Sequence, residues 1–246
     1  VPVARLDEFS AALRELSPVP GTEWRLAGLL GARVAANAAT ARAFNATHAG
    51  RALIDVLEGK LDTPDAIVNA AASASGEFAV YAEIGVDRDP AALIAVIREV
   101  GIGAKIRTGG VTAEAIPAAA DVIRFMRCCI EARVAFKATA GLHHPLRADR
   151  SLTYSIEAPR GVMYGFLNVF LAAAFLEFGA SDVDAQRVLE EQDAAAFTVR
   201  DGAIAWGDRS LSAAQLRATR DVVAVSFGSC SFREPVDDLR ALSLLA

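Results

Sequence analysis

The sequence of 246 residues contains few cysteines, few lysines and few histidines, and no run of basic residues. Its three cysteines cannot all pair, two of them are adjacent, and none has the spacing of metal ligands. We therefore expect reduced thiols and a cytoplasmic location. The net charge of −5 argues against a nucleic-acid partner.

The chain also lacks a recognisable membrane span or secretory leader. The longest apolar stretch, residues 161–179, contains Asn168 and Glu177, which leaves fewer than the roughly 20 apolar residues that a spanning helix needs. We expect a helix that is buried in the core or at the interface of a homo-oligomer. The start, VPVARLDEF, has no signal-peptide features. Because Val1 is not a methionine, we expect that residues upstream of it are missing.

Hydrophobic residues make up 53% of the chain and recur as short apolar runs that alternate with helical stretches. Such alternation is typical of a parallel sheet covered by helices, and roughly 250 residues suit eight βα units. The sequence therefore predicts an α/β fold, a (β/α)8 TIM barrel that forms a single domain over residues 1–246. The predicted strands are residues 1–6, 24–31, 52–61, 78–85, 104–110, 135–141, 197–206 and 222–229.

An open, doubly wound sheet is the main alternative, because periodicity alone does not show closure. No GxGxxG motif follows the first predicted strand, which removes the main reason to prefer a dinucleotide-binding fold. An Asp-Gly pair in the middle of residues 197–206 also favours a hairpin there over a plain barrel strand.

Polar and charged side chains fall on three consecutive predicted strands. A barrel interior is usually filled with branched apolar residues, so inward charges there would form a polar cluster. Side chains alternate along a strand, and residues two apart share a face. The pairs that share a face are Tyr81 with Glu83, Lys105 with Arg107, and Lys137 with Thr139.

Only three lysines occur, Lys60, Lys105 and Lys137, and all lie on predicted strands. A lysine loses its proton more readily than an arginine when it is desolvated or lies beside another cation. The neutral amine is the form that attacks a carbonyl carbon. We expect Lys105 to favour the neutral amine of Lys137 in this way. A structural ion pair of Glu83 with Lys137 or Arg107 is the alternative.

Three short motifs at these positions resemble deoxyribose-phosphate aldolase and its class I relatives. AKIRTGGVTAEAI (104–116) resembles the family's fifth strand and the loop after it. AFKATAG (135–141) resembles the sixth-strand motif, whose lysine forms the Schiff base. VSFGSCSF (225–232) resembles the eighth-strand motif, which holds the substrate phosphate. The resemblance implies a Schiff base on Lys137, phosphate contacts from Gly228, Ser229 and Ser231, and no metal or organic cofactor.

The chain departs from this family at two positions. The predicted seventh strand carries Arg200 but no lysine, and the acid nearest to the family's fourth-strand aspartate is Glu83. The second half of the chain also resembles a set of bacterial proteins that have no assigned function. Shared fold ancestry without a shared reaction therefore stays open.

His143 and His144 follow the sixth predicted strand, at the mouth where barrel loops carry function. Either can transfer protons near neutral pH. Together with Glu83 they define an alternative function, that of an isomerase or a metal-assisted hydrolase. A ligand-binding barrel without catalysis is a third hypothesis. Cys230 has no base beside it in the sequence, and we assign it no role.

The favoured hypothesis is a class I lyase or aldolase that acts on a small carbonyl compound of the sugar-phosphate type. Lys137 is the predicted nucleophile and Lys105 the cation that assists it. Glu83, His143 or His144 would move protons. The predicted substrate contacts are Tyr81, Arg107, Thr139, Gly228, Ser229 and Ser231.

Overall fold

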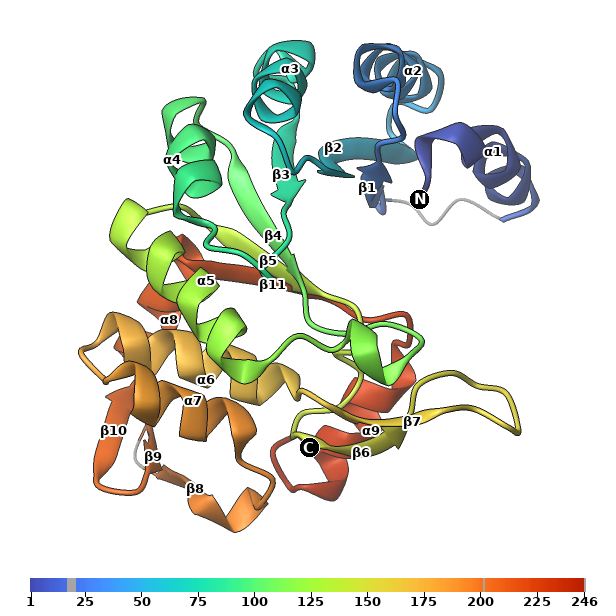
Figure 1. The fold of residues 1–246 in the computed structure, drawn as a ribbon. Coiled ribbons are helices and arrows are strands. Elements are labelled where there is room, and N and C mark those ends of the chain that lie inside the picture. The colour runs from blue at the N-terminus through green and yellow to red at the C-terminus, as the bar shows by residue number, and fades with distance from the viewer. Residues whose placement is uncertain (17–20, 201, 246) are drawn as a thin grey trace. The chain divides into compact units, whose positions relative to one another are not determined.

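The computed structural model describes residues 1–16, 21–200 and 202–245. Six parallel strands form one sheet in the order β1-β2-β3-β4-β5-β11 (Figure 1). The expected α/β class is confirmed, and the strand order follows the chain without the reversal that defines a doubly wound sheet. The strands span Trp24–Leu29 (β1), Ala52–Lys60 (β2), Ala79–Glu83 (β3), Gly103–Arg107 (β4), Phe136–Thr139 (β5) and Ala224–Gly228 (β11).

The predicted closed barrel of eight strands is wrong, first because residues 1–6 do not form a strand. The 3-10 helix η1 (Val3–Arg5) runs directly into helix α1 (Leu6–Glu15). A single isolated parallel bridge joins Pro2 to Leu29. Proline has no N–H to donate to a strand ladder, which helps to explain why the pairing stops there.

The second difference lies at residues 197–206, where a hairpin takes the place of a barrel strand. Strands β8 (Phe197–Arg200) and β9 (Ala203–Trp206) pair in antiparallel register, and β10 (Arg209–Ser212) adds a third strand to this separate sheet. Gly202 has a φ of +74°, which suits a tight turn, whereas Asp201 lies outside the described residues. Among the described residues, the parallel sheet therefore has six strands.

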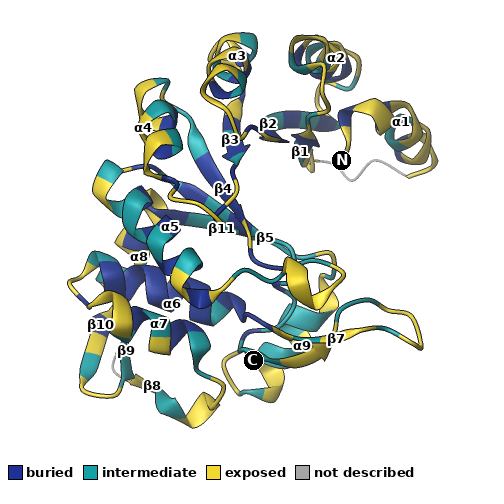
Figure 2. Ribbon diagram, viewed as in Figure 1, coloured by how far each residue is buried: buried dark blue, intermediate teal, exposed yellow. Residues whose placement is uncertain are grey.

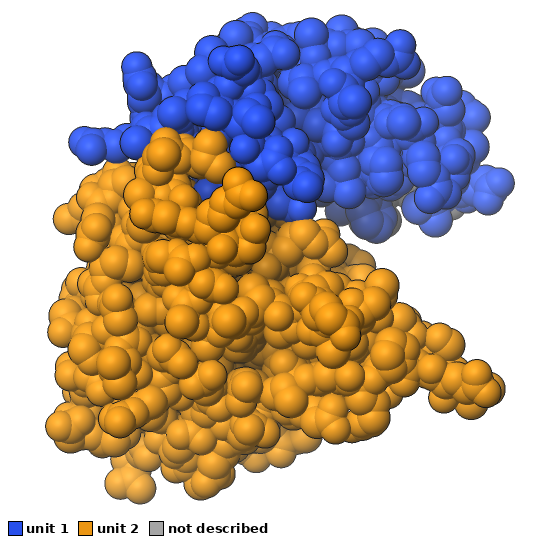
Figure 3. Space-filling model, in the orientation of Figure 1, with its two compact units in different colours: residues 1–84, 95–104 blue, residues 85–94, 105–246 orange. Residues whose placement is uncertain are grey.

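The chain divides into two compact units, which Figure 3 colours separately. Unit 1 comprises residues 1–84 and 95–104, and unit 2 comprises residues 85–94 and 105–246. The division passes through helix α4 (Ala91–Glu99) and strand β4. The expectation of one domain stays a prediction.

In unit 1, the parallel strands β1, β2 and β3 alternate with helices α2 (Val34–Thr47) and α3 (Pro64–Ala74). Helix α3 begins where Thr63 accepts a hydrogen bond from the Ala66 amide at 3.3 Å, with proline at the first helical position. The parallel register places Glu58 on β2 opposite Tyr81 on β3.

In unit 2, strands β5 and β11 pair in parallel, and helix α5 (Ala119–Ala132) covers one face of β5. The rings of Phe125 on α5 and Phe136 on β5 meet edge to face, with centroids 5.5 Å apart. Because side chains alternate along a strand, Lys137 and Thr139 lie on the face of β5 opposite α5.

The apolar stretch predicted to be a buried helix forms α6 (Phe166–Glu177), which is buried along almost its whole length (Figure 2). It packs against α5, α7 (Asp182–Glu190) and α8 (Ala213–Val222) within unit 2. The buried-helix interpretation is thereby confirmed, while the homo-oligomer stays a prediction. Across the described residues, no helix combines the length and the apolar composition needed to cross a membrane.

The remaining elements of unit 2 follow β4, β5, α7 and β11 in the chain. The loop after β5 leads into an antiparallel hairpin, and β11 leads into the last helix. These elements are β6 (Ala148–Ser151), β7 (Arg160–Met163) and α9 (Arg233–Ala241), together with the 3-10 helices η2 (Ala113–Ala115) and η3 (Ala194–Ala196).

Candidate functional site

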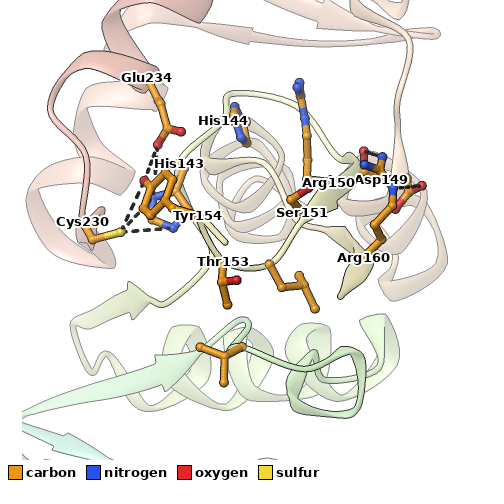
Figure 4. Close-up of a pocket in the computed structure, with 12 residues that line it drawn as sticks. His143, His144, Asp149, Arg150, Ser151, Thr153, Tyr154, Arg160, Cys230 and Glu234 are labelled. Carbon is orange, nitrogen blue, oxygen red and sulfur yellow. Dashed lines mark hydrogen bonds and ion pairs between the residues drawn. The ribbon is translucent and has the colours of Figure 1, made fainter. Parts of the chain in front are cut away.

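A cavity of about 520 Å³ lies in unit 2, lined by the loop after β5, the β6–β7 hairpin, the loop after β11 and the start of α9. A volume of this size is typical of small-molecule sites. Figure 4 shows His143, Tyr154, Cys230 and Glu234 gathered at one end, and Asp149 and Arg160 at the other.

His143 is fixed by a hydrogen-bond network with the loop after β11. Its Nδ1 lies 3.0 Å from Ser229 Oγ, and that hydroxyl donates to the Ser231 carbonyl at 2.8 Å and accepts from the Ser231 amide at 3.2 Å. Ser229 has one hydroxyl proton, and it is donated to the Ser231 carbonyl. Ser229 Oγ can therefore only accept a hydrogen bond from His143, which requires that His143 Nδ1 carries a proton. We infer from these bonds that neutral His143 carries its proton on Nδ1, which leaves Nε2 as an acceptor.

Cys230 and Glu234 complete the cluster around His143. The Cys230 sulfur lies 3.6 Å from His143 Nε2 and 3.7 Å from Nδ1. One carboxylate oxygen of Glu234 lies 3.9 Å from Nδ1 and accepts a hydrogen bond from the Tyr154 hydroxyl at 2.9 Å. A thiol, an imidazole and a carboxylate therefore meet at one end of the cavity.

Electrostatics keep His143 neutral near physiological pH. Burial lowers the pKa of the His143 imidazole below its ordinary value of 6.5, His144 also lowers it, and the charge of Glu234 opposes them. Hydrogen bonds to Cys230 and Glu234 raise the pKa of the exposed Tyr154 hydroxyl well above its usual range. The His143 imidazole and the Tyr154 hydroxyl are thus both neutral at pH 7. A neutral imidazole can act as a base, and a neutral hydroxyl can donate a hydrogen bond.

His144 is oriented by a different acid. Its Nδ1 lies 2.6 Å from a carboxylate oxygen of Asp238 on α9. The two histidine rings are 6.4 Å apart and nearly perpendicular, so they present their nitrogens in different directions. In the part of the chain that the structure describes, no group of three His, Cys, Asp or Glu side chains is placed to hold a metal ion.

Two arginines supply positive charge to the cavity. Arg160 donates to the Asp149 carboxylate at 3.1 Å, whereas the exposed Arg150 has no acidic group within 4.0 Å among the described residues. Arg150 therefore brings the cation that a bound anion could engage.

The two lysines predicted to take part in catalysis, Lys105 and Lys137, also lie in unit 2, on neighbouring strands of the sheet. Lys105 on β4 is buried, with 6% of its surface exposed, and Arg107 is exposed at the end of that strand. Lys137 is half-buried on β5 and has Ser226 on β11 as its register partner. Lys137 is not among the residues that line the cavity.

Gly228 is the last residue of β11, and Ser229 and Ser231 follow it in the loop that leads to α9. Gly228 pairs with Thr139 in the parallel register, and a Cβ at its position would lie 3.2 Å from the Thr139 methyl group. Ser231 Oγ accepts from the Glu234 amide at 3.2 Å and keeps its own proton to donate. The hydroxyl of Ser229 is instead used within the loop.

Tyr81 and Glu83 belong to unit 1, where both are half-buried on the same face of β3. Burial raises the pKa of the Tyr81 hydroxyl, and the charge of Glu58 raises it further. Glu58 is itself buried, with 5% of its surface exposed.

Sequence reasoning did not single out Glu58, Glu234 or Asp238, and it assigned no role to Cys230 or Arg150. A hydrogen-bonding partner such as His143 lies 87 positions from Cys230, so no local pattern reveals the pair. The only local signal was that Cys230 stands between two of the predicted substrate-binding serines.

Comparison of the chain with known protein families, curated proteins and solved structures found no match.

Proposed function

We propose that this protein is a class I lyase or aldolase that forms a Schiff base between Lys137 and a small carbonyl compound. The observation that carries the proposal is the register of β5 against β11. It sets Lys137 opposite Ser226 and Thr139 opposite Gly228, so two aldolase-like motifs from distant parts of the chain lie side by side.

The surroundings of Lys137 suit an amine nucleophile. Strand β4 is the neighbour of β5 on the side away from β11, and its end is held there by the Thr108 amide, which donates to the Thr139 carbonyl at 2.8 Å. Lys105 on β4 is buried. The uncharged amine is the form of a lysine that adds to a carbonyl group.

The reaction follows from that amine. Lys137 Nζ adds to the substrate carbonyl carbon, water leaves, and the cationic imine withdraws electrons so that a carbon–carbon bond two atoms away can break. We assign proton transfer to His144, because Asp238 holds its Nδ1 and leaves Nε2 as the second ring nitrogen to exchange protons.

A phosphate or carboxylate on the substrate fits the loop between β11 and α9. The Ser231 hydroxyl retains a proton to donate, and the amides in the first turn of α9 offer positive potential, which the carboxylate of Glu234 in the same turn partly offsets. The substrate class is therefore a small aldehyde or ketone that carries an anionic group.

Borohydride inactivation tests the proposal. The protein is assayed with a panel of hydroxyketones and sugar phosphates, and each compound is then added together with borohydride, which reduces an imine to a stable amine. We expect turnover of at least one compound and inactivation that requires that compound. Lys137→Met should abolish both effects, whereas Lys60→Met, which changes an exposed lysine of unit 1, should abolish neither. Turnover that survives in Lys137→Met would refute the proposal.

A further inference from the structure

The geometry points to a second reactive centre in unit 2: Cys230 acts as the nucleophile of an acyl-transfer reaction, with His143 as its general base and Glu234 as the acid that supports the imidazolium. This inference does not depend on Lys137 or Lys105, although Cys230 lies in the loop between β11 and α9 that the Schiff-base proposal assigns to the anionic group of its substrate.

The base is defined by the network behind it. His143 Nδ1 donates to Ser229 Oγ, so the lone pair of the neutral ring lies on Nε2, and the Cys230 sulfur is 3.6 Å from that atom. The sulfur is almost as close to Nδ1, at 3.7 Å, so it lies beside the ring and not in line with the Nε2 lone pair. A rotation of the Cys230 side chain has to bring the thiol in line with Nε2 before the proton moves. Such contacts are often long before a substrate binds and shorten when it does. A thiol beside an imidazole that is oriented by a third group is the arrangement of an activated nucleophile.

The charge that forms on His143 has a partner in place. Once Nε2 takes the thiol proton, the imidazolium lies 3.9 Å from the Glu234 carboxylate. Tyr154 holds that carboxylate with a hydrogen bond of 2.9 Å. Opposite charges at such a distance in a partly buried site attract appreciably, which favours the proton transfer.

Accessibility separates Cys230 from the other two cysteines. Cys230 is exposed and lines the cavity, Cys128 is half-buried on α5, and Cys129 is fully buried there. Burial raises the pKa of both α5 thiols, which makes them poor nucleophiles. Cys128 is therefore the matched control for Cys230.

The cavity also indicates which acyl compounds it takes. Arg150 lines it without an acidic partner within 4.0 Å in the described part of the chain, whereas Arg160 is occupied by Asp149. A cation available in a cavity of about 520 Å³ suits a small ester or thioester whose acyl part carries a carboxylate.

The chemical step is balanced with water as the only further reactant. The Cys230 thiol gives its proton to His143 Nε2, and the sulfur bonds to the ester carbonyl carbon. The carbon–oxygen bond to the alcohol breaks, and the alcohol leaves with the proton from His143. Water, deprotonated by His143, then attacks the thioester, which releases the carboxylic acid and restores the thiol.

The test uses the nitrophenyl esters of acetic acid and of succinic acid as probes, with the full chain. We expect release of nitrophenol and, in samples stopped with acid, an acyl group that peptide mass mapping places on Cys230. Cys230→Ser should remove the adduct, His143→Gln should slow its formation by about 100-fold, and Cys128→Ser should change neither. Arg150→Gln should abolish the preference for the succinyl over the acetyl ester.

Two results would overturn the inference: wild-type protein that forms no adduct on Cys230, or an adduct whose rate is unchanged by His143→Gln. Alkylation by iodoacetamide keeps the test independent of the choice of ester. His143→Gln should slow alkylation of Cys230 at least tenfold and leave that of Cys128 unchanged. A circular dichroism spectrum equal to that of the wild type establishes that each variant is folded.

Discussion

Lys137 on β5 and Ser226 on β11 are register partners in a parallel strand pair. The pair joins the segment 135–141 to the segment 225–232, the two motifs that would supply the nucleophile and the anion-binding loop of a class I aldolase. Thr139 and Gly228 continue the same register toward the carboxyl ends of both strands, the edge at which parallel α/β folds bind their ligands.

Removing the positive charge at Lys105 tests how Lys137 is activated. We expect Lys105→Met to slow imine formation by roughly 10- to 100-fold, because the substitution removes the positive charge from the strand beside Lys137. Lys105→Arg keeps the charge and should retain most of the rate. The rate of borohydride-trapped product measures the effect, and equal rates in both variants would contradict the assignment of Lys105.

The unfolding free energy should depend on pH through His143. Burial lowers the pKa of His143 in the folded protein below its ordinary value of 6.5, with Glu234 opposing the shift. Between these two pKa values the unfolded chain binds more protons, so stability is fully present above pH 6.5 and falls as the pH is lowered through this window. Urea unfolding from pH 7.5 to pH 5 should give a smaller loss of stability in His143→Gln than in the wild type. A greater or equal loss in the variant would contradict the assignment.

Asn168 should contribute strongly to the stability of unit 2, because it is a fully buried amide within the apolar helix α6. Its side-chain nitrogen donates to the Val188 and Glu191 carbonyls at 2.8 and 2.9 Å, and its oxygen accepts from the Arg147 amide at 2.8 Å. Asn168→Leu leaves three backbone groups without these partners and should destabilise the protein by about 3–6 kcal/mol.

The matched control is Asn69→Leu, which replaces an exposed asparagine on α3 and should change the unfolding free energy by no more than about 0.5 kcal/mol. Denaturant unfolding followed by tryptophan fluorescence reports on both variants, because the indole of Trp206, one of the two tryptophans, donates to Glu191 near this network. Equal changes in the unfolding free energy from the two substitutions would contradict the stabilising role of the Asn168 hydrogen bonds.

Gly165 should not tolerate a side chain. A Cβ at this position would collide with the Pro145 carbonyl oxygen and the Leu146 Cα, both of which are backbone atoms that cannot rotate away. We expect Gly165→Ala to reduce the yield of folded protein and to displace the loop that carries His144, whose carbonyl accepts from the Phe166 amide. Gly31→Ala, where the nearest atom lies 3.4 Å away, should leave thermal unfolding nearly unchanged.

The parts of the fold that the sequence predicted correctly depend on local patterns. Short apolar runs such as 52–61 and 135–141 form parallel strands, and the apolar stretch 161–179 contains a buried helix. The prediction of a closed barrel was wrong because closure depends on pairing between strands that are far apart in the sequence. Residues 1–6 have an apolar pattern but make one bridge, at Pro2, and residues 197–206 pair with themselves and with β10.

The candidate site was predictable only where a strand or a motif marks a residue. The alternation along β5 correctly placed Lys137 and Thr139 on one face. The partners of the histidines come from far along the chain, since Ser229 lies 86 positions from His143 and Asp238 lies 94 positions from His144. Spatial neighbours at such separations leave no periodic or motif signal in a single sequence.

Peptide mapping of the reduced adduct tests the Schiff-base proposal most directly. Wild-type protein, Lys137→Met and Lys60→Met are incubated with the best carbonyl compound and borohydride, then digested and analysed by mass spectrometry. Because the chain has only three lysines, the modified position is unambiguous. The account predicts an adduct on Lys137 in the wild type and in Lys60→Met, and no adduct on any lysine in Lys137→Met. An adduct on Lys60 or Lys105 in place of Lys137, or none in folded wild-type protein, would contradict it.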